Sequence, residues 1–466
     1  MSIHLKAMVS YFGKALCVMF YIVPVSELTL GDDDAVPKYF LHYGLPMFFA
    51  FIFIEYIILR ILSASGYPVG GSAGDKPKGG PTAYRLNDFI ACTLIGSFQQ
   101  VCLLLFELVG LNFESTMYTM VYNHCRLATI NAKEHPLFVY FALMLGKDLG
   151  YYWAHRCMHE LHVLWVGHSV HHSGEDYNLA TGLRQGVTQP ILGWIFYIPL
   201  ALCGFHPTAF SAHAQLNTLY MFWIHTDLIG RLPFGLEYIF NSPMAHRMHH
   251  RPPGNCNYAG MLIIWDRMFG TYIPEITRMD VYGLAQQPNT FDPLKLNMNH
   301  VKRLIGSRKA GAADSPSSSK KATPTLFQSL LRKRWHHPLK FDPALLFKPI
   351  PDERGDKRAA PKRVKWNGHR ALSRLGALFL GAAGLCTIIA GVVLLITKKS
   401  MHVMDTAAAI IVWIFAASAV LRFADQYGEG NEDKRGARQT MLLLPVLWAI
   451  LLARPVQLVM AEEFEK

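Results

Sequence analysis

The sequence predicts an all-α protein that crosses a membrane several times. About half of the chain, 51%, is hydrophobic, and five apolar runs approach or exceed the roughly 20 residues that a helix needs to cross a bilayer. These runs are residues 43–64, 88–110, 371–397, 405–423 and 440–459. Because a soluble fold has no use for so many long runs without amphipathic breaks, a multi-spanning helical membrane protein is expected.

Four shorter or more polar stretches bring the expected number of transmembrane helices to about nine. They are residues 8–28, 136–153, 188–204 and 207–227. The first contains Lys14 and has no convincing small-residue cleavage site, so we expect a span and not a signal peptide.

The positive charge of the chain is concentrated in one stretch. Residues 302–370 hold 18 Lys and Arg against 5 Asp and Glu, a net charge of +13. Between membrane spans, such a stretch is typical of a cytosolic loop beside anionic lipid. No aromatic-interleaved binding module accompanies it, so a nucleic-acid partner is not expected.

This charge and a low-complexity segment at 306–324, which we expect to be disordered, divide the chain into three parts. Residues 1–300 form a membrane-embedded catalytic unit, 301–370 a basic and partly disordered cytosolic linker, and 371–466 a bundle of three transmembrane helices. If the linker is cytosolic, the histidine-rich stretches of the first part share its face of the membrane.

Three histidine motifs contribute 8 of the 21 histidines within 96 residues. The first, His155-x3-His159, continues the 136–153 helix, and Asp148, Tyr152, His155, His159 and His162 are spaced to share one helical face. The second motif comprises His168, His171 and His172, and the third His246, His249 and His250; each shares one face if its stretch is helical. For the third, Ser242 can cap a short helix that begins at Pro243 and ends before Pro252–Pro253.

These motifs predict a site for two metal ions. A lone histidine is more often a buried polar group than a ligand, but eight converging imidazoles without a metal leave many polar groups without partners. A closed zinc site has four ligands, so eight or nine imidazoles imply two ions. Imidazole suits zinc, copper, iron and nickel, so the spacing alone leaves the metal open.

His225 is the expected ninth ligand. It lies at the cytosolic end of the 207–227 span, where an ionisable side chain is costly unless it is paired. The alternative is a hydrogen bond from its ring to Asp227 or to a backbone carbonyl. His206 and His213 are expected toward the opposite end of the 188–227 hairpin, far from the motifs. Asp148 or Tyr152 is placed to accept a hydrogen bond from a ligand ring and so to fix it.

The motif-bearing segments resemble the fatty acid hydroxylase superfamily of membrane diiron enzymes, and within it a branch that cleaves alkylglycerol ether lipids. The resemblance is strong over about 140–300 and is carried by GKDLGYYWAHRCMHELHVLWVGHSVHHSGEDYNLATGLRQ (146–185), HTDLIG (225–230), NSPMAHRMHH (241–250) and NYAGMLIIWDRMFGTY (257–272). It implies two non-haem iron ions, molecular oxygen and tetrahydrobiopterin as reductant, in the endoplasmic reticulum membrane. The implied reaction hydroxylates the alkyl carbon next to the ether oxygen of a bilayer lipid, which then yields a fatty aldehyde and a glycerol derivative.

The resemblance also implies roles for individual residues. Glu160 matches an acidic position after the family's first motif and is expected to act in catalysis or to contact the cofactor, with an ion pair to Arg156 as the alternative. Asn178, Arg184 and Gln185 are expected to line the cofactor pocket, and hydrogen bonding within a loop or at a helix terminus is an equal alternative. Trp265, Asp266 and Arg267 are expected to hold the third motif in place.

Two rival functions remain at this stage. A sterol or fatty acid hydroxylase or desaturase that receives electrons from cytochrome b5 shares the histidine pattern. A metal transporter is the non-enzyme alternative, but transporters place ligands near the bilayer midplane, whereas these motifs flank the ends of spans. No obligate protein partner is expected.

Deleting residues 306–324 should leave catalysis and iron content largely unchanged, because the segment lies outside every histidine motif. Turnover and bound iron of the purified deletion protein check this. Loss of iron would show that the segment supports the metal site.

Overall fold

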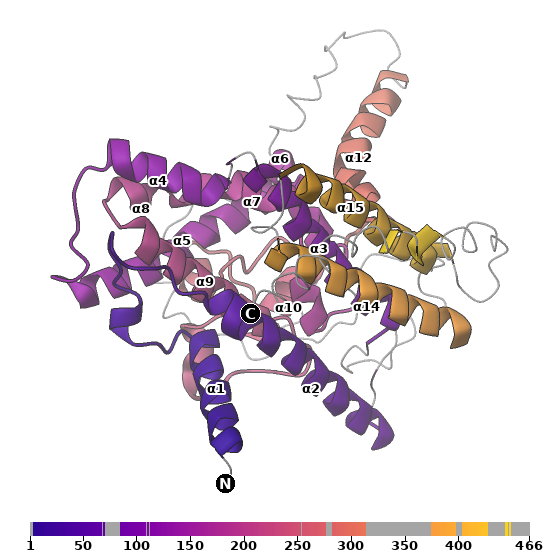
Figure 1. Ribbon diagram of the computed structural model, residues 1–466, viewed down its shortest axis with the longest axis horizontal. Helices are drawn as coiled ribbons and strands as arrows, with labels where there is room; N and C mark the ends of the chain where they lie inside the picture. The colour runs from indigo at the N-terminus through magenta and orange to yellow at the C-terminus, as the bar shows by residue number, and fades with distance from the viewer. Residues whose placement is uncertain are drawn as a thin grey trace, which may run out of the picture.

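A computed structural model describes residues 3–67, 84–108, 112–252, 254–275, 282–313, 374–397 and 403–426, with a few single positions beside them. Its described residues form helices and no strand, apart from one isolated bridge between Phe240 and Leu262 (Figure 1). The elements are α1 (Ile3–Met19), η1 (Val25–Glu27), η2 (Phe40–Gly44), α2 (Leu45–Ala64), α3 (Leu86–Leu108), α4 (Phe113–Cys125), α5 (Pro136–Glu160), α6 (His162–His171), η3 (Leu179–Leu183), α7 (Thr188–Gly193), η4 (Trp194–Tyr197), α8 (Ile198–Leu202), α9 (Pro207–Trp223), η5 (Pro233–Tyr238), α10 (Pro243–His250), α11 (Ile264–Met268), α12 (Pro293–Ala313), α14 (Arg374–Thr397) and α15 (Val403–Gln426).

Four helices in the described part of the chain are long and apolar enough to cross a membrane. They are Phe40–Ala64, Leu86–Leu108, Ala377–Leu394 and Thr406–Asp425, so the spans predicted at 43–64, 88–110, 371–397 and 405–423 are confirmed as membrane-length helices. The total of nine spans and their orientation stay predictions. Most of the fifth long run, 440–459, lies outside the described residues.

The shorter predicted spans differ from single membrane-length helices. The run 8–28 forms α1 only as far as Met19, after which the chain turns at Tyr21, where φ is 63°. The run 188–204 is divided into α7, η4 and α8, because Pro199 cannot donate a hydrogen bond to the preceding turn. Residues 136–153 and 207–227 do form long helices, α5 and α9, of 25 and 17 residues.

Helices α5 and α9 form the centre of the larger hydrophobic core. Val139 and Leu143 of α5 and Leu216 and Leu219 of α9 are buried in one cluster with side chains of α1 and α2. At Gly146 an added Cβ would lie 2.5 Å from Leu200, so α5 also packs closely against α8. This packing fixes the end of α5 that carries the first histidine motif.

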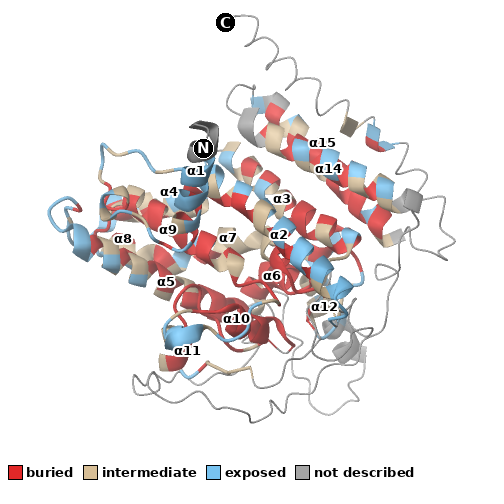
Figure 2. Cartoon of the chain, turned by 90° about the horizontal axis from the view of Figure 1, so that it is seen from below, coloured by how far each residue is buried: buried red, intermediate tan, exposed pale blue. Residues whose placement is uncertain are grey.

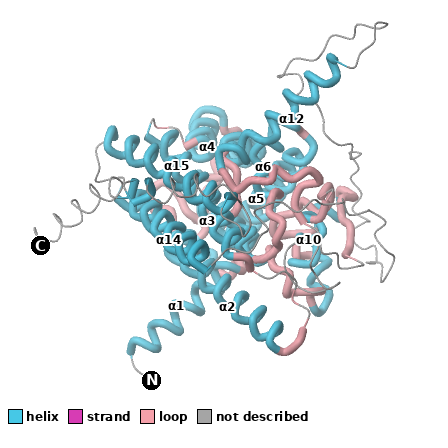
Figure 3. Tube along the Cα trace, turned by 90° about the vertical axis from the view of Figure 1, so that its right-hand side faces the viewer, coloured by secondary structure: helices cyan, strands magenta, loops and turns pink. Residues whose placement is uncertain are grey.

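The C-terminal helices α14 and α15 pack on α3, side by side on one flank of the molecule (Figures 1 and 3). Leu380 and Trp413 share a buried cluster with Ile90 of α3, and the Trp413 indole donates to the carbonyl of Thr387 over 2.8 Å. The predicted third helix of this bundle lies largely outside the described residues. The described pair therefore shares its core with the N-terminal unit.

The segment before α12 is attached to α15 by hydrogen bonds. Asp425 accepts from the Thr290 hydroxyl and the Phe291 amide, each over 2.6 Å, and Arg422 donates to Asp292 over 2.8 Å. Helix α12 then continues to Ala313, so residues 306–313 are helical and not disordered as expected. The remaining linker, 314–373, lies outside the described residues.

Replacing Asp425 with Ala should lower the free energy of unfolding by about 1–3 kcal/mol, because it leaves two donors without their acceptor. Thermal unfolding of the full-length protein in detergent measures the loss. Arg422→Ala is the control and should cost less, since its side chain is 48% exposed and exposed ion pairs contribute little. Equal stability of Asp425→Ala and the natural protein would contradict this role.

Candidate metal centre

The first two histidine motifs lie on two helices that meet at a sharp break. Helix α5 ends at Glu160, and Leu161 is extended, with φ −115° and ψ 128°, before α6 begins at His162. His155 and His159 therefore share a face of α5 with Asp148 and Tyr152, as predicted. The prediction that His162 continues that face is wrong, because the chain reverses before it; His162 instead contacts His300, at 2.9 Å between ring nitrogens.

The third motif lies on α10, which begins and ends where the sequence predicts. The Ser242 hydroxyl accepts from the amide of Ala245 over 3.2 Å, and Pro243 occupies the first turn. The helix stops at His250 because Arg251, which precedes Pro252, is extended. Loop segments surround α10 on this side of the molecule (Figure 3).

All nine predicted ligands converge in two buried groups, in which the candidate ligand atoms lie within 4.8 Å of one another. One group is His155, His159, His168, His172 and His249, and the other is His171, His225, His246 and His250. Both α6 and α10 contribute to both groups, and both helices are largely buried (Figure 2). The His172 and His250 rings stack at 4.4 Å, which joins the two groups.

Backbone carbonyls fix the orientation of four rings. The Nδ1 atoms of His155, His171, His225 and His249 lie 2.7–2.9 Å from the carbonyl oxygens of Tyr258, Arg184, Met221 and Cys256, respectively. Since a carbonyl oxygen only accepts, each of these Nδ1 atoms carries the proton. The remaining nitrogen, Nε2, is then a lone-pair donor that points into the site.

Pairs of Nε2 atoms lie so close together that their lone pairs would repel each other without a cation between them. His155 and His168 approach within 2.9 Å, and His171 and His225 within 3.3 Å, through these atoms. Two imidazole nitrogens bound at right angles to one metal ion, each about 2.1 Å from it, lie about 3.0 Å apart. The spacing of the described imidazoles therefore fits a pair of metal ions.

Burial keeps these rings neutral. It lowers the pKa of His155 to about 3 and that of His171 to about 4, because the charged imidazolium would lose its hydration in the interior. The pKa values of His168, His172, His246, His249 and His250 are lowered in the same direction and by the same cause. At neutral pH the rings are therefore in the form that binds metal.

His225 forms the hydrogen bond to a backbone carbonyl that the sequence allowed, and it also lies among the candidate ligands. Its Nδ1 is bonded to the Met221 carbonyl, and its Nε2 lies 3.0 Å from Nε2 of His246. Asp227, the other predicted partner, accepts from the Tyr282 hydroxyl. His206 and His213 lie outside both groups, as expected: His206 contacts Asp32 at 2.8 Å, and His213 contacts the Tyr21 hydroxyl.

Asp148 and Tyr152 do not hold a histidine ring, which corrects the expectation from their spacing. Asp148 accepts hydrogen bonds of 2.7–2.9 Å from the amides of Met261 and Leu262, the Trp265 indole and the Asn217 amide. The Tyr152 hydroxyl contacts Thr271 and Arg156 instead. The two residues face the segment 257–272 and hold it against α5.

The segment 257–272 in turn holds the first histidine motif. Asp266 accepts from the amides of Tyr258 and Ala259 over 2.8 and 2.7 Å, which fixes the Tyr258 carbonyl against His155. Burial raises the pKa of Asp266 to about 6. At Gly260 an added Cβ would lie 2.8 Å from Asp148, so a larger residue would displace this contact.

Glu160 forms the predicted ion pair with Arg156, with 3.0 Å between Oε1 and Nε. The pair is buried and not on the surface: side-chain exposures are 11% for Glu160 and 1% for Arg156. The next residue along the helix face, Tyr152, also accepts from Arg156 over 3.2 Å. Glu160 thus lies in a buried polar cluster directly after the ligand candidate His159.

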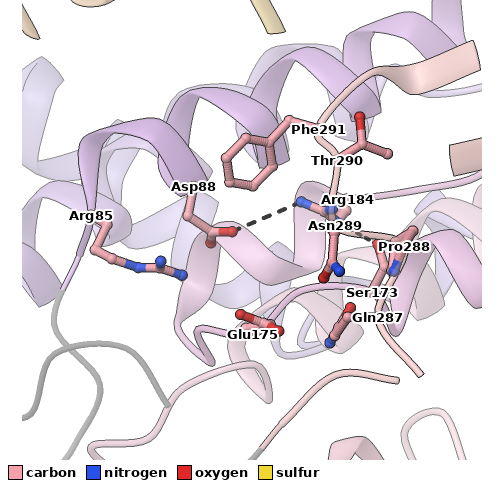
Figure 4. Close-up of a pocket in the computed structure, with 10 residues that line it drawn as sticks. All are labelled: Arg85, Asp88, Ser173, Glu175, Arg184, Gln287, Pro288, Asn289, Thr290 and Phe291. Carbon is pink, nitrogen blue, oxygen red and sulfur yellow. Dashed lines mark hydrogen bonds and ion pairs between the residues drawn. The ribbon is translucent and has the colours of Figure 1, made fainter. Parts of the chain in front are cut away.

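The three residues predicted to bind a cofactor, Asn178, Arg184 and Gln185, lie in different environments. Asn178 caps η3 through the amide of Ala180, which is the helix-terminus alternative. The Gln185 amide nitrogen lies 3.5 Å from Nδ1 of His171. Arg184 donates to Ser173 and lines a polar pocket with Asp88, Glu175 and Gln287 (Figure 4).

Gln189 is a site residue that the sequence did not reveal. Its Oε1 lies 3.1 Å from Nδ1 of His168 and completes the ring-fixing contacts. The segment reaches α6 because Gly186 and Gly167 allow close approach: a Cβ on Gly186 would lie 2.2 Å from the Gly167 carbonyl oxygen. The glycine pair in the sequence is the one signal that could have indicated this contact.

Comparison with known proteins agrees with this geometry. Residues 140–271, which include the eight motif histidines and His225, match the family model described as fatty acid hydroxylase. The chain is 38% identical to alkylglycerol monooxygenase of Homo sapiens over 287 residues, covering 61% of this chain and 59% of that protein. It is also 38% identical to alkylglycerol monooxygenase of Xenopus tropicalis over 291 residues, covering 62% of this chain and 59% of that protein.

A more distant relative is a probable Delta(7)-sterol 5(6)-desaturase of Neurospora crassa, 30% identical over 145 residues, which cover 30% of this chain and 38% of the relative. The chain spans about three fifths of the length of the alkylglycerol monooxygenases it matches. No solved structure matches the chain significantly. The family match and the histidine groups together fit a non-haem iron site.

Gln189→Leu should weaken iron binding about ten- to a hundredfold, because a ligand ring that loses its hydrogen-bond acceptor is poorly oriented. Iron retained by the purified protein during titration with a chelator measures the change. Gln185→Leu is the matched control and should retain iron, since His171 already has the Arg184 carbonyl as acceptor. Equal chelator sensitivity of Gln189→Leu and the natural protein would contradict the proposed role.

Proposed function

We propose that this chain is a membrane-bound ether-lipid monooxygenase that hydroxylates the alkyl carbon next to the ether oxygen of alkylglycerols. The observation that carries the proposal is the convergence of nine buried imidazoles in two groups. The similarity to alkylglycerol monooxygenases extends over about 60% of the chain and supports the substrate class. We place the enzyme in the endoplasmic reticulum membrane with the histidine motifs facing the cytosol.

The nine histidines are proposed as ligands of two iron ions, five on one and four on the other. When bound, such a pair supplies the redox chemistry that activates molecular oxygen, and we propose tetrahydrobiopterin as the reductant. One oxygen atom enters the substrate as a hydroxyl group and the other leaves as water. The resulting hemiacetal then separates into a fatty aldehyde and a glycerol derivative.

The residues of this chain contribute orientation and exclusion of water. Four imidazoles are held with Nε2 directed inward by the carbonyls of Tyr258, Arg184, Met221 and Cys256. These ligand atoms are therefore oriented before metal binds. Trp165 and Tyr258 cover the five-histidine group, with ring centroids 4.9 and 5.4 Å from His159. A largely dry site strengthens electrostatic interactions and limits side reactions of activated oxygen.

The other predicted site residues receive different roles in this proposal. Glu160 lies beside the ligand His159 and is proposed to act in catalysis or to contact the cofactor. Arg184 and Gln185 lie beside His171 and stay the proposed cofactor contacts. Asp148, Tyr152 and Asn178 are assigned to positioning, because their hydrogen bonds are made within the scaffold.

The lipid substrate is proposed to enter laterally from the bilayer. Candidate spans such as Phe40–Ala64 place an apolar surface beside the catalytic unit, and Phe53 and Ile61 of α2 are exposed. A sterol or fatty acid desaturase or hydroxylase fed by cytochrome b5 is the second candidate, favoured by the similarity to a sterol desaturase. That similarity covers half as much of this chain as the match to the ether-lipid enzymes.

The purified full-length protein should release fatty aldehyde from a 1-O-alkylglycerol when oxygen and tetrahydrobiopterin are both supplied. The His249→Ala variant should lower turnover at least a hundredfold while remaining in the membrane fraction, because it removes one imidazole of the five-histidine group. Aldehyde release measured with and without the pterin is the test.

A parallel assay supplies cytochrome b5, its reductase and NADH in place of the pterin, with sterol or fatty acid substrates. Product in this assay and none from the alkylglycerol would overturn the proposal in favour of the second candidate. Full alkylglycerol turnover by His249→Ala would show that the histidine groups are not the active site.

A further inference from the structure

His225 is the one member of the two histidine groups that lies on a loop and not on a helix or its cap. The loop, residues 224–229, follows the end of α9 and is fixed at each end. The Tyr177 hydroxyl donates to the carbonyl of Ile224 over 3.0 Å, and Arg247 donates to the carbonyl of Ile229 over 2.7 Å. The middle of the loop therefore determines where the His225 ring lies.

Glu55 holds the middle of this loop from a membrane helix. The Thr226 hydroxyl donates to Oε1 of Glu55 over 2.5 Å, and Thr226 directly follows His225. Thr226 Oγ1 also accepts from the amide of Leu228 over 3.2 Å, which closes the turn. Glu55 thus reaches the ligand loop through a single hydroxyl.

The second oxygen of Glu55 holds the other segment that supports the four-histidine group. Oε2 accepts from the amide of Leu179 over 2.8 Å and from the Tyr84 hydroxyl. Leu179 opens η3, and Arg184, which caps the other end of η3, supplies the carbonyl that orients His171. Within η3, a Cβ on Gly182 would lie 3.2 Å from Nδ1 of His225, so the two supports lie in contact.

Glu55 is a buried carboxylate in the apolar helix α2, and its burial is unfavourable unless the side chain has a defined role. It belongs to the candidate span Phe40–Ala64 and is 3% exposed, while Phe53 and Ile54 beside it are 63% and 46% exposed. A carboxylate within a membrane span is unfavourable unless it is paired or serves the site it faces. The carboxylate oxygens of Glu55 accept hydrogen bonds from the two segments that position His225 and His171.

We propose that Glu55 is a positioning residue for the four-histidine group, holding the His225 loop and η3 in register so that the second metal ion can bind. This inference rests on the proposed two-iron function. The rings of the five-histidine group are oriented by the carbonyls of Tyr258 and Cys256 and by Gln189 of α7, whereas Glu55 is bonded to Tyr84, Leu179 and Thr226, so this group does not depend directly on Glu55. Loss of the Glu55 contacts should therefore empty one metal position and leave the other filled.

The test compares iron content of the purified full-length proteins. Glu55→Leu removes the acceptor and keeps an apolar side chain suited to a membrane helix, and iron should fall from about two to about one per chain. Thr226→Val removes only the contact to the His225 loop and should lower iron in the same direction. Glu55→Gln keeps a carbonyl oxygen that can accept from the Leu179 amide. The Thr226 hydroxyl can rotate to accept a hydrogen bond from the new NH2 group, so the iron content should return toward two ions per chain.

Thr93→Val is the matched control, because Thr93 is equally buried but donates within its own helix, to the carbonyl of Phe89. It should retain two iron ions. Two iron ions in both Glu55→Leu and Thr226→Val would overturn the positioning role, and so would loss of both ions in Thr226→Val. A natural protein that itself holds no iron would instead overturn the proposed function.

Discussion

The hydrogen bond from an imidazole Nδ1 to a fixed acceptor is the interaction on which this site depends. Nine imidazoles packed together would be an unstable arrangement if their protons were free to move, because each ring could turn either nitrogen inward. Carbonyl acceptors at Tyr258, Arg184, Met221 and Cys256 remove that freedom for four of the rings, and the Gln189 side chain contacts a fifth. When Nδ1 carries the proton, the lone pairs on the Nε2 atoms point into the site and repel one another. A cation between them stabilises the arrangement.

This requirement explains why so much of the structure around the histidines is short helix and ordered loop. Main-chain carbonyls inside a helix are already paired, so acceptors for ligand rings come from helix ends and irregular segments. Such segments need support of their own, which buried carboxylates supply: Asp148 and Asp266 for residues 257–272, and Glu55 for the His225 loop. Asp148 and Glu55 lie on the long helices α5 and α2, whereas Asp266 lies on the short helix α11 within the segment that it supports.

The sequence indicates the parts of this arrangement that have a periodic or local signal. Long apolar runs identified α2, α3, α14 and α15, because helices of this length and composition are rare outside membranes. Ser242 and Pro243 marked the start of α10, and histidine spacing identified the eight motif members of the two groups. The position of His225 at the end of an apolar run was enough to single it out.

Other parts carry no such signal. A backbone carbonyl has the same chemistry in every residue, so the acceptors for the rings could not be identified before the fold was known. Gln189 lies within a stretch without periodicity. The chain reverses at Leu161, so His162 leaves the shared face, and no proline or glycine in the sequence indicates this reversal. Asp148 was correctly placed on the histidine face, but three of its four partners come from a segment more than a hundred residues away.

The central claim, that two metal ions are held by imidazole alone, is tested most directly by iron analysis of the purified natural protein combined with X-ray absorption at the iron edge. We expect about two iron ions per chain and a coordination shell dominated by imidazole nitrogen. One iron ion or fewer, or a shell dominated by carboxylate oxygen, would contradict it.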